Sequence, residues 1–123
     1  MIKILIVDDS KFAQRVTASM IGRYVENAEF MFAGDGEEGI DKFKALHPDF
    51  LIIDLLMPKL RGQDLIEKIR QIDFNAKIIV LSADIQHRVR LVLDKMGILS
   101  FINKPINEEK AKKIASIIGN GAL

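Results

Sequence analysis

The sequence contains no cysteine and no tryptophan, and it has only two histidines and three prolines among its 123 residues. Without cysteine the chain can form neither a disulfide nor a zinc–thiolate site, and it offers no thiol nucleophile. The two histidines, His47 and His87, lie far apart in the sequence and are not typical of a metal cluster. Carboxylates, hydroxyls and amines are therefore the groups on which chemistry could rest.

Long hydrophobic runs are also missing. The apolar start at residues 1–7 is closed by Asp8 and Asp9, and it is too short for a signal sequence or a membrane span. We therefore expect a cytoplasmic protein without membrane contact. The net charge of +1 does not indicate nucleic acid binding, and we expect no direct contact with nucleic acid. The chain length suits one domain with its own core.

Apolar, β-branched runs alternate along the chain with segments of helical periodicity. This alternation predicts an α/β fold with a parallel sheet. The expected strands are Ile2–Val7, Phe30–Ala33, Phe50–Ile53, Lys77–Leu81 and Leu99–Asn103. The residues expected on buried helical faces are Ala13, Val16, Thr17, Met20 and Ile21; Ile40, Phe43 and Leu46; Leu65, Ile66 and Ile69; Ile85, Val89, Val92 and Met96; and Ala111, Ile114, Ala115 and Ile118.

Helix boundary signals agree with this alternation. Asp35 is a predicted N-cap, and Glu38 stands three residues later in the register of a capping box. Asn107 precedes two glutamates, which are favoured in the first turn of a helix. Gly97 stands where a residue of left-handed conformation would end the fourth helix.

Polar residues stand where four of the five expected strands end. Asp8 and Asp9 follow the first strand, Asp54 follows the third, Ser82 the fourth and Lys104 the fifth. Ligands of open parallel sheets bind beyond the carboxyl ends of the strands. We therefore expect these side chains to gather at one edge of the sheet.

The gathered groups suggest phosphoryl chemistry on a metal site. Three neighbouring carboxylates repel one another unless a cation intervenes, and Mg2+ prefers oxygen ligands of this kind. A lysine and a serine at the same edge fit an anion that joins the metal. An aspartate such as Asp54 can act as nucleophile toward a phosphoryl group. Asp8, Asp9, Ser82 or Lys104 alone would more often be a turn, cap or loop residue. Asp54 is harder to explain in this way, because an acid that follows an apolar strand needs a partner. The conjunction of these residues at matching strand ends favours function.

Four segments together resemble the receiver domains of response regulators. They are ILIVDDS at 4–10, LIIDLLMP at 51–58, IIVLSAD at 78–84 and FINKPI at 101–106. The resemblance extends from Ile2 to about Ile118. It implies a flavodoxin-like (βα)5 fold, with a doubly wound five-stranded parallel sheet in the order 2-1-3-4-5. Residues 1–119 would form the receiver domain, and residues 120–123 a tail or the start of a linker.

The resemblance also implies roles for the residues at the sheet edge. Asp54 matches the phosphoacceptor, and Asp8 and Asp9 match the acidic pair, with Asp9 the more direct Mg2+ ligand. The backbone carbonyl of Leu56 matches the third protein ligand of the metal. Lys104 matches the lysine that contacts the phosphoryl group.

Three further positions concern the response to phosphorylation. Ser82 matches the switch hydroxyl, where threonine is commoner, and it supplies the same hydroxyl. Phe101 matches the switch aromatic, where tyrosine is frequent, and it keeps the bulk without the phenol. The peptide bond between Lys104 and Pro105 is expected to be cis.

The implied function is a phosphorylatable switch, which supports only its own phosphorylation and dephosphorylation and is otherwise not an enzyme. A sensor histidine kinase or a phosphotransfer protein would donate the phosphoryl group. The surface of the fourth helix, fifth strand and fifth helix would then control a downstream protein or an output domain. Two alternatives are a phosphohydrolase, which usually needs a second acid near the nucleophile, and a phosphorylation-independent interaction domain. Leu55 and Leu56 follow Asp54, so no such acid stands beside it in the sequence.

Overall fold

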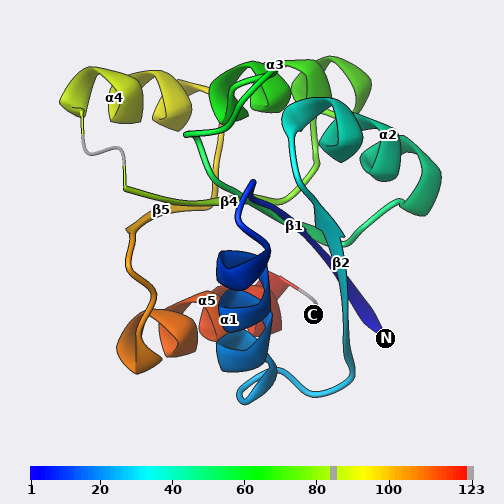
Figure 1. The fold of residues 1–123 in the computed structure, drawn as a ribbon, viewed down its shortest axis with the longest axis vertical. Coiled ribbons are helices and arrows are strands. Elements are labelled where there is room, and N and C mark those ends of the chain that lie inside the picture. Colours follow the sequence, from blue (N-terminus) through cyan, green and yellow to red (C-terminus); the bar gives the residue numbers. More distant parts are fainter. Residues whose placement is uncertain (84–85, 122–123) are drawn as a thin grey trace.

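Five parallel strands form one sheet in the order β2-β1-β3-β4-β5 (Figure 1). The computed structural model describes residues 1–83 and 86–121. The strands are β1 (Ile2–Val7), β2 (Ala28–Ala33), β3 (Phe50–Ile53), β4 (Ile78–Ser82) and β5 (Ser100–Asn103). The expected α/β fold and strand order are thereby confirmed.

Helices cover both faces of this sheet. They are α1 (Lys11–Gly22), α2 (Gly36–Leu46), α3 (Gly62–Ile72), α4 (His87–Lys95) and α5 (Glu108–Gly121). Figure 1 shows α1 and α5 on one side of the sheet and α2, α3 and α4 on the other. A separate hydrophobic cluster lies on each side, and the sheet supplies residues to both. The helices that follow the neighbouring strands β1 and β3 therefore lie on opposite faces of the sheet. Sheets of this kind bind ligands at such a point.

The inner strands carry the core. All residues of β3 and β4 are buried, as expected for parallel strands covered on both faces. The prediction for β2 was wrong at its start, because the strand begins at Ala28 rather than Phe30 and pairs with β1 from Ile2 onward. Its position at the sheet edge leaves Glu29 exposed, so the apolar pattern marks only its second half. Strand β4 reaches one residue further than predicted and includes Ser82.

The predicted helix boundaries are confirmed at three places. The Asp35 carboxylate accepts a 2.8 Å hydrogen bond from the Glu38 amide, and the Glu38 carboxylate accepts one of 2.8 Å from Gly34. Asn107 caps α5 by accepting a 2.8 Å bond from the amide three residues later. Gly97 has a φ of +76°, the left-handed conformation that follows a helix end. Residues 34–39 read G-x-G-x-x-G, a pattern that also occurs in nucleotide-binding loops, and here they form a capped helix start.

The predicted buried faces of α3 and α5 are confirmed, since every residue expected there is buried. The face of α4 was predicted incompletely. Its fully buried residue is Leu93, which was not among those expected, while Val89 and Met96 pack beside it and Val92 is half-buried. The remaining predicted member, Ile85, lies outside the described residues. Leu93 stands one turn after Val89, so the buried stripe of α4 is centred on Leu93 rather than on Val92.

The buried face of α1 was predicted incompletely, because Ala13, Val16 and Met20 are only half-buried and one buried residue is polar. Gln14 is buried together with Thr17 and Ile21, although an amide side chain was not expected on this face. Helix α5 includes Asn120 and Gly121, and residues 122–123 of the expected tail lie outside the described part.

Within the described ranges, no helix is both long and apolar enough for a membrane span.

Candidate functional site

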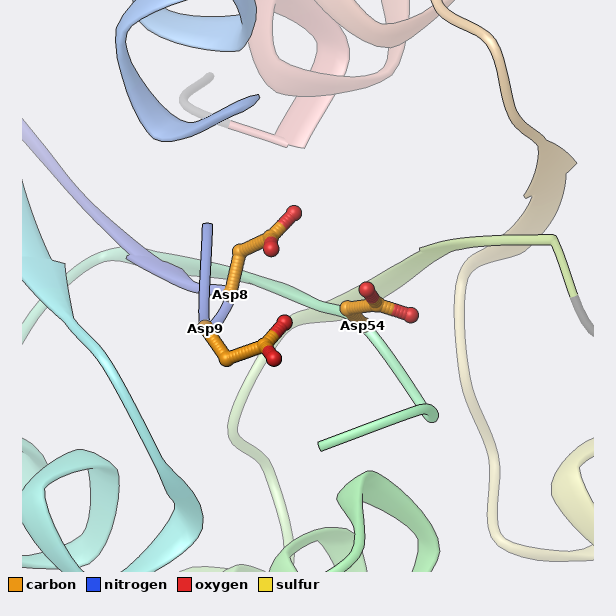
Figure 2. Close-up of side chains that lie close together, drawn as sticks. All are labelled: Asp8, Asp9 and Asp54. Atoms are coloured by element: carbon orange, nitrogen blue, oxygen red, sulfur yellow. The ribbon is translucent and has the colours of Figure 1, made fainter. Parts of the chain in front are cut away.

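Three carboxylates meet at the carboxyl ends of β1 and β3. Asp8, Asp9 and Asp54 each offer an oxygen, and these oxygens all lie within 4.8 Å of one another (Figure 2). Asp8 and Asp54 are only 3% and 6% exposed, whereas Asp9 is exposed to solvent. The sequence prediction that these residues gather at one sheet edge is therefore met by the geometry.

Both carboxylate oxygens of Asp54 have hydrogen bond donors. The Ser82 hydroxyl donates to Oδ1 over 2.8 Å, and the Leu56 amide donates to the same oxygen over 3.1 Å. The Lys104 ammonium donates to Oδ2 over 2.9 Å. A hydroxyl at the end of β4 and an ammonium just after β5 thus converge on one buried carboxylate.

Lys104 joins this carboxylate to the acidic pair. Its ammonium also donates to Asp8 Oδ2 over 2.7 Å. Burial by itself lowers the pKa of Lys104, but the hydrogen bonds and charges of Asp8 and Asp54 raise it more, so the pKa lies above its ordinary value. The lysine therefore carries its charge at neutral pH. One ammonium does not balance three carboxylates, and the remaining negative charge favours a cation with oxygen ligands.

Asp8 is fixed by the start of α1 as well. Its Oδ1 accepts a 3.0 Å hydrogen bond from the Ser10 amide, and Ser10 is itself the N-cap of α1. The Lys104–Pro105 peptide bond is cis, as the resemblance implied. Asp8 is thus held both by the start of α1 and by Lys104 after β5.

The loop after Asp54 passes very close to α3. A Cβ atom added to Gly62 would lie 2.3 Å from the carbonyl oxygen of Asp54 and 2.7 Å from the Leu55 Cα. The Gly62 amide also donates to the Leu55 carbonyl over 3.2 Å. Only glycine allows this approach, because the atoms in the way belong to the backbone. Gly62 was not predicted from the sequence, because the requirement for glycine at this position comes from tertiary packing and leaves no local pattern.

The two expected switch residues are close to the cluster and to α4, respectively. Ser82 is fully buried and already contacts the Asp54 carboxylate. Phe101 is half-buried, and the guanidinium of Arg90 on α4 lies 5.0 Å from its ring centroid. The Leu56 side chain is 55% exposed, and the role of its carbonyl as a metal ligand stays a prediction.

The fold and the site define a doubly wound α/β domain with an acidic cluster at its switch point. Comparison with known families is decisive. Residues 4–116 match the response regulator receiver domain, and the chain belongs to this family. Receiver domains generally act in two-component and chemotaxis signalling as switches rather than as conventional enzymes.

Known proteins similar to the chain support this assignment. The chemotaxis protein CheY of Thermotoga maritima is 37% identical, over 88% of this chain and 89% of that protein. Protein CcdB of Bacillus subtilis is 35% identical, over 94% and 96% of the two chains.

Solved structures show the same fold. A CheY-like receiver domain protein from Methanospirillum hungatei has a TM-score of 0.88 at 23% identity, with coverage of 99% of this chain and 97% of that one. The CheX–CheY–BeF3–Mg complex from Borrelia burgdorferi has a TM-score of 0.86 at 27% identity, with coverage of 99% and 90%.

Proposed function

We propose that this receiver domain accepts a phosphoryl group on Asp54 from a sensor histidine kinase or a phosphotransfer protein. The observation that carries the proposal is the environment of the Asp54 carboxylate. It is buried at the switch point, and the Ser82 hydroxyl and the Lys104 ammonium each contact one of its oxygens. These are the donors that a transferred phosphoryl group would need, already placed around the nucleophile.

The transfer itself forms one bond and breaks one. A carboxylate oxygen of Asp54 attacks the phosphorus, and the bond between phosphorus and the donor's histidine nitrogen breaks, leaving an acyl phosphate on the protein. Lys104 is placed to bind one phosphoryl oxygen while keeping its bond to Asp8. Ser82 is placed to donate to another oxygen. Preorganised donors of this kind stabilise the charge that spreads over a transferring phosphoryl group.

We propose Mg2+ as the cofactor of this step. Asp8, Asp9, Asp54 and the Leu56 carbonyl would hold it, and the donor set fits, because three carboxylates offer hard oxygen ligands within 4.8 Å. Bound Mg2+ would neutralise negative charge on the phosphoryl oxygens. The structure of the related Borrelia burgdorferi CheY in complex with Mg and BeF3 supports this choice.

The proposed output is a change on the surface formed by α4, β5 and α5. Ser82 would exchange its bond to Asp54 for one to the phosphoryl group, and Phe101 on β5 would reorient against α4. Such a change shifts an existing equilibrium, because phosphorylation favours one of two arrangements. A downstream protein or a separate output domain would read this surface, and the place of action would be the cytoplasm.

Intact-mass spectrometry tests the proposal. After incubation with phosphoramidate and Mg2+, we expect one phosphoryl adduct on the parent and on Asp41→Asn, a control at an exposed acid on α2. The adduct should be absent from Asp54→Asn and after addition of EDTA. An unmodified parent would contradict the proposal and favour a phosphorylation-independent interaction domain. Steady turnover of a phosphomonoester would favour the phosphohydrolase instead.

A further inference from the structure

The amide side chain of Gln14 joins three elements just behind the acidic pair. Its Nε2 donates to the Asp8 carbonyl over 2.7 Å and to the Ala33 carbonyl over 3.2 Å. Gln14 lies in the first turns of α1, while Asp8 follows β1 and Ala33 ends β2. One buried amide group thus links the ends of two strands to the start of a helix.

Gln14 is itself held firmly in this place. Its backbone amide donates to the carbonyl of Ser10, the N-cap residue, over 2.9 Å. Its side chain is 8% exposed, so water competes little for its hydrogen bonds. The Ala33 carbonyl also accepts a 3.0 Å bond from the Asp8 amide. Gln14, Asp8 and Ala33 therefore form a closed set of hydrogen bonds, which fixes the peptide group between Asp8 and Asp9.

This peptide group matters because the backbone on either side of Asp9 directs its side chain. Within residues 1–83 and 86–121, the Asp9 carboxylate makes no hydrogen bond or ion pair of its own. Asp8 is different, since Ser10 and Lys104 hold both of its carboxylate oxygens. Figure 2 shows the Asp9 side chain leaving the end of β1 beside Asp8 and facing the same space as Asp54. The direction of the exposed Asp9 carboxylate thus depends on its backbone.

We infer that Gln14 is a positioning residue for the metal site, acting through the Asp8 carbonyl on the orientation of Asp9. The inference rests on the proposed function and adds a residue that does not touch the metal or the phosphoryl group. An amide suits the position because it offers two N–H donors to two carbonyl oxygens without a charge. A carboxylate there would place an acceptor against two acceptors, and an apolar side chain would leave a buried carbonyl unpaired.

The test compares two Gln14 variants with a control on the same helix face. Gln14→Glu keeps the shape and replaces the donor group, and Gln14→Leu removes the hydrogen bonds altogether. Thr17→Val alters a residue that is also buried on α1, one turn further on, and that makes no hydrogen bond to Asp8 within the described residues. Calorimetric titration with Mg2+ gives the dissociation constant of each folded variant. Partners that orient metal ligands typically change metal affinity by about tenfold to a hundredfold.

We expect the Mg2+ dissociation constant to rise about tenfold in both Gln14 variants and to change less than about twofold in Thr17→Val. At saturating Mg2+ the rate of adduct formation from phosphoramidate should return to near that of the parent, since Asp54, Ser82 and Lys104 are intact. The Asp9 amide resonance should also shift in the Mg2+-free Gln14→Glu protein and stay in place in the control.

Parent-like Mg2+ affinity in a folded Gln14→Glu protein would overturn the inference. So would equal losses of affinity in the Gln14 and Thr17 variants, because a general loosening of α1 would then explain both. If Gln14→Leu does not fold, the isosteric Gln14→Glu still decides. Failure of the parent to bind Mg2+ would contradict the proposed function instead, and the two failures are thus distinguishable.

Discussion

Gly62→Ala should damage both the stability and the acceptor site, because the added methyl group has no room. The new Cβ would lie 2.3 Å from the Asp54 carbonyl oxygen, while ordinary contacts begin at 3.4 Å. The overlap is therefore about 1 Å, and it involves backbone atoms of residues 54 and 55 that cannot turn aside as a side chain would.

The expected magnitude follows from two opposing effects. Relieving the overlap should cost about 3 kcal/mol, at the upper end of the usual range for overpacked sites. Alanine is favoured over glycine in helices by up to ~1 kcal/mol, and this gain is smaller at the first residue of α3. The net loss in the free energy of unfolding should be about 2 kcal/mol. With a urea m-value of about 2 kcal/mol/M, the midpoint should fall by roughly 1 M.

Urea unfolding followed by far-ultraviolet circular dichroism measures this change. Gly119→Ala is the matched control, since a Cβ at that position in α5 meets no atom within 4 Å. Its midpoint should equal or slightly exceed that of the parent. The Gly62 variant should also accept phosphoryl groups more slowly, since the displaced carbonyl belongs to Asp54 itself. A midpoint for Gly62→Ala at or above the parent value would refute the reasoning.

Three further predictions concern α4 and the contact between Tyr24, which follows α1, and the start of α5. Arg70 donates hydrogen bonds to three backbone carbonyls, two of them at the end of α4, so Arg70→Ala should lower the free energy of unfolding by about 2 kcal/mol. Arg70→Lys should recover less than half of the lost free energy of unfolding, since a lysine cannot reproduce the guanidinium's several donors. Full recovery would argue against the three hydrogen bonds of Arg70. Leu93→Ala removes the fully buried side chain of α4 and should cost about 3 kcal/mol in the same urea assay, whereas a loss below about 1 kcal/mol would mean that α4 packs differently. Tyr24 is the single tyrosine, and its hydrogen bond to Glu108 raises the pKa of the phenol, with burial and the Glu108 charge adding to the effect. The stabilisation from this bond is present below the ordinary phenol pKa of about 10 and is lost as the pH rises through the raised value. In a pH titration followed by tyrosinate absorbance, the pKa of Tyr24 should therefore be lower in Glu108→Gln than in the parent. An unchanged pKa would contradict the hydrogen bond between Tyr24 and Glu108.

Much of the fold could be predicted because local signals agreed with one another. The runs of β1 and β3 are short, apolar apart from Lys3 and followed by acids, which defines both the strand and its functional end. The capping box at Asp35 marks a helix start through local chemistry alone. Edge strand β2 was harder to delimit, because an exposed residue near its start interrupts the apolar pattern.

The parts of the site that were missed depend on tertiary contacts. Gln14 looks like a surface residue in the sequence, and its burial follows only from the meeting of two strand ends beside α1. Gly62 is needed because the loop after Asp54 folds back onto α3, which no local pattern reveals. The main residues at the strand ends were predictable for the opposite reason, since parallel topology alone brings such ends together.

The most direct test of the central claim is to locate the phosphoryl group on the chain. Borohydride reduces an aspartyl phosphate to homoserine, and peptide mass spectrometry then identifies the converted residue. We predict conversion at residue 54 alone in protein treated with phosphoramidate and Mg2+, and none when Mg2+ is withheld. Conversion at Asp8 or Asp9, or no converted residue in protein that carries the adduct, would contradict the assignment of Asp54 as the acceptor.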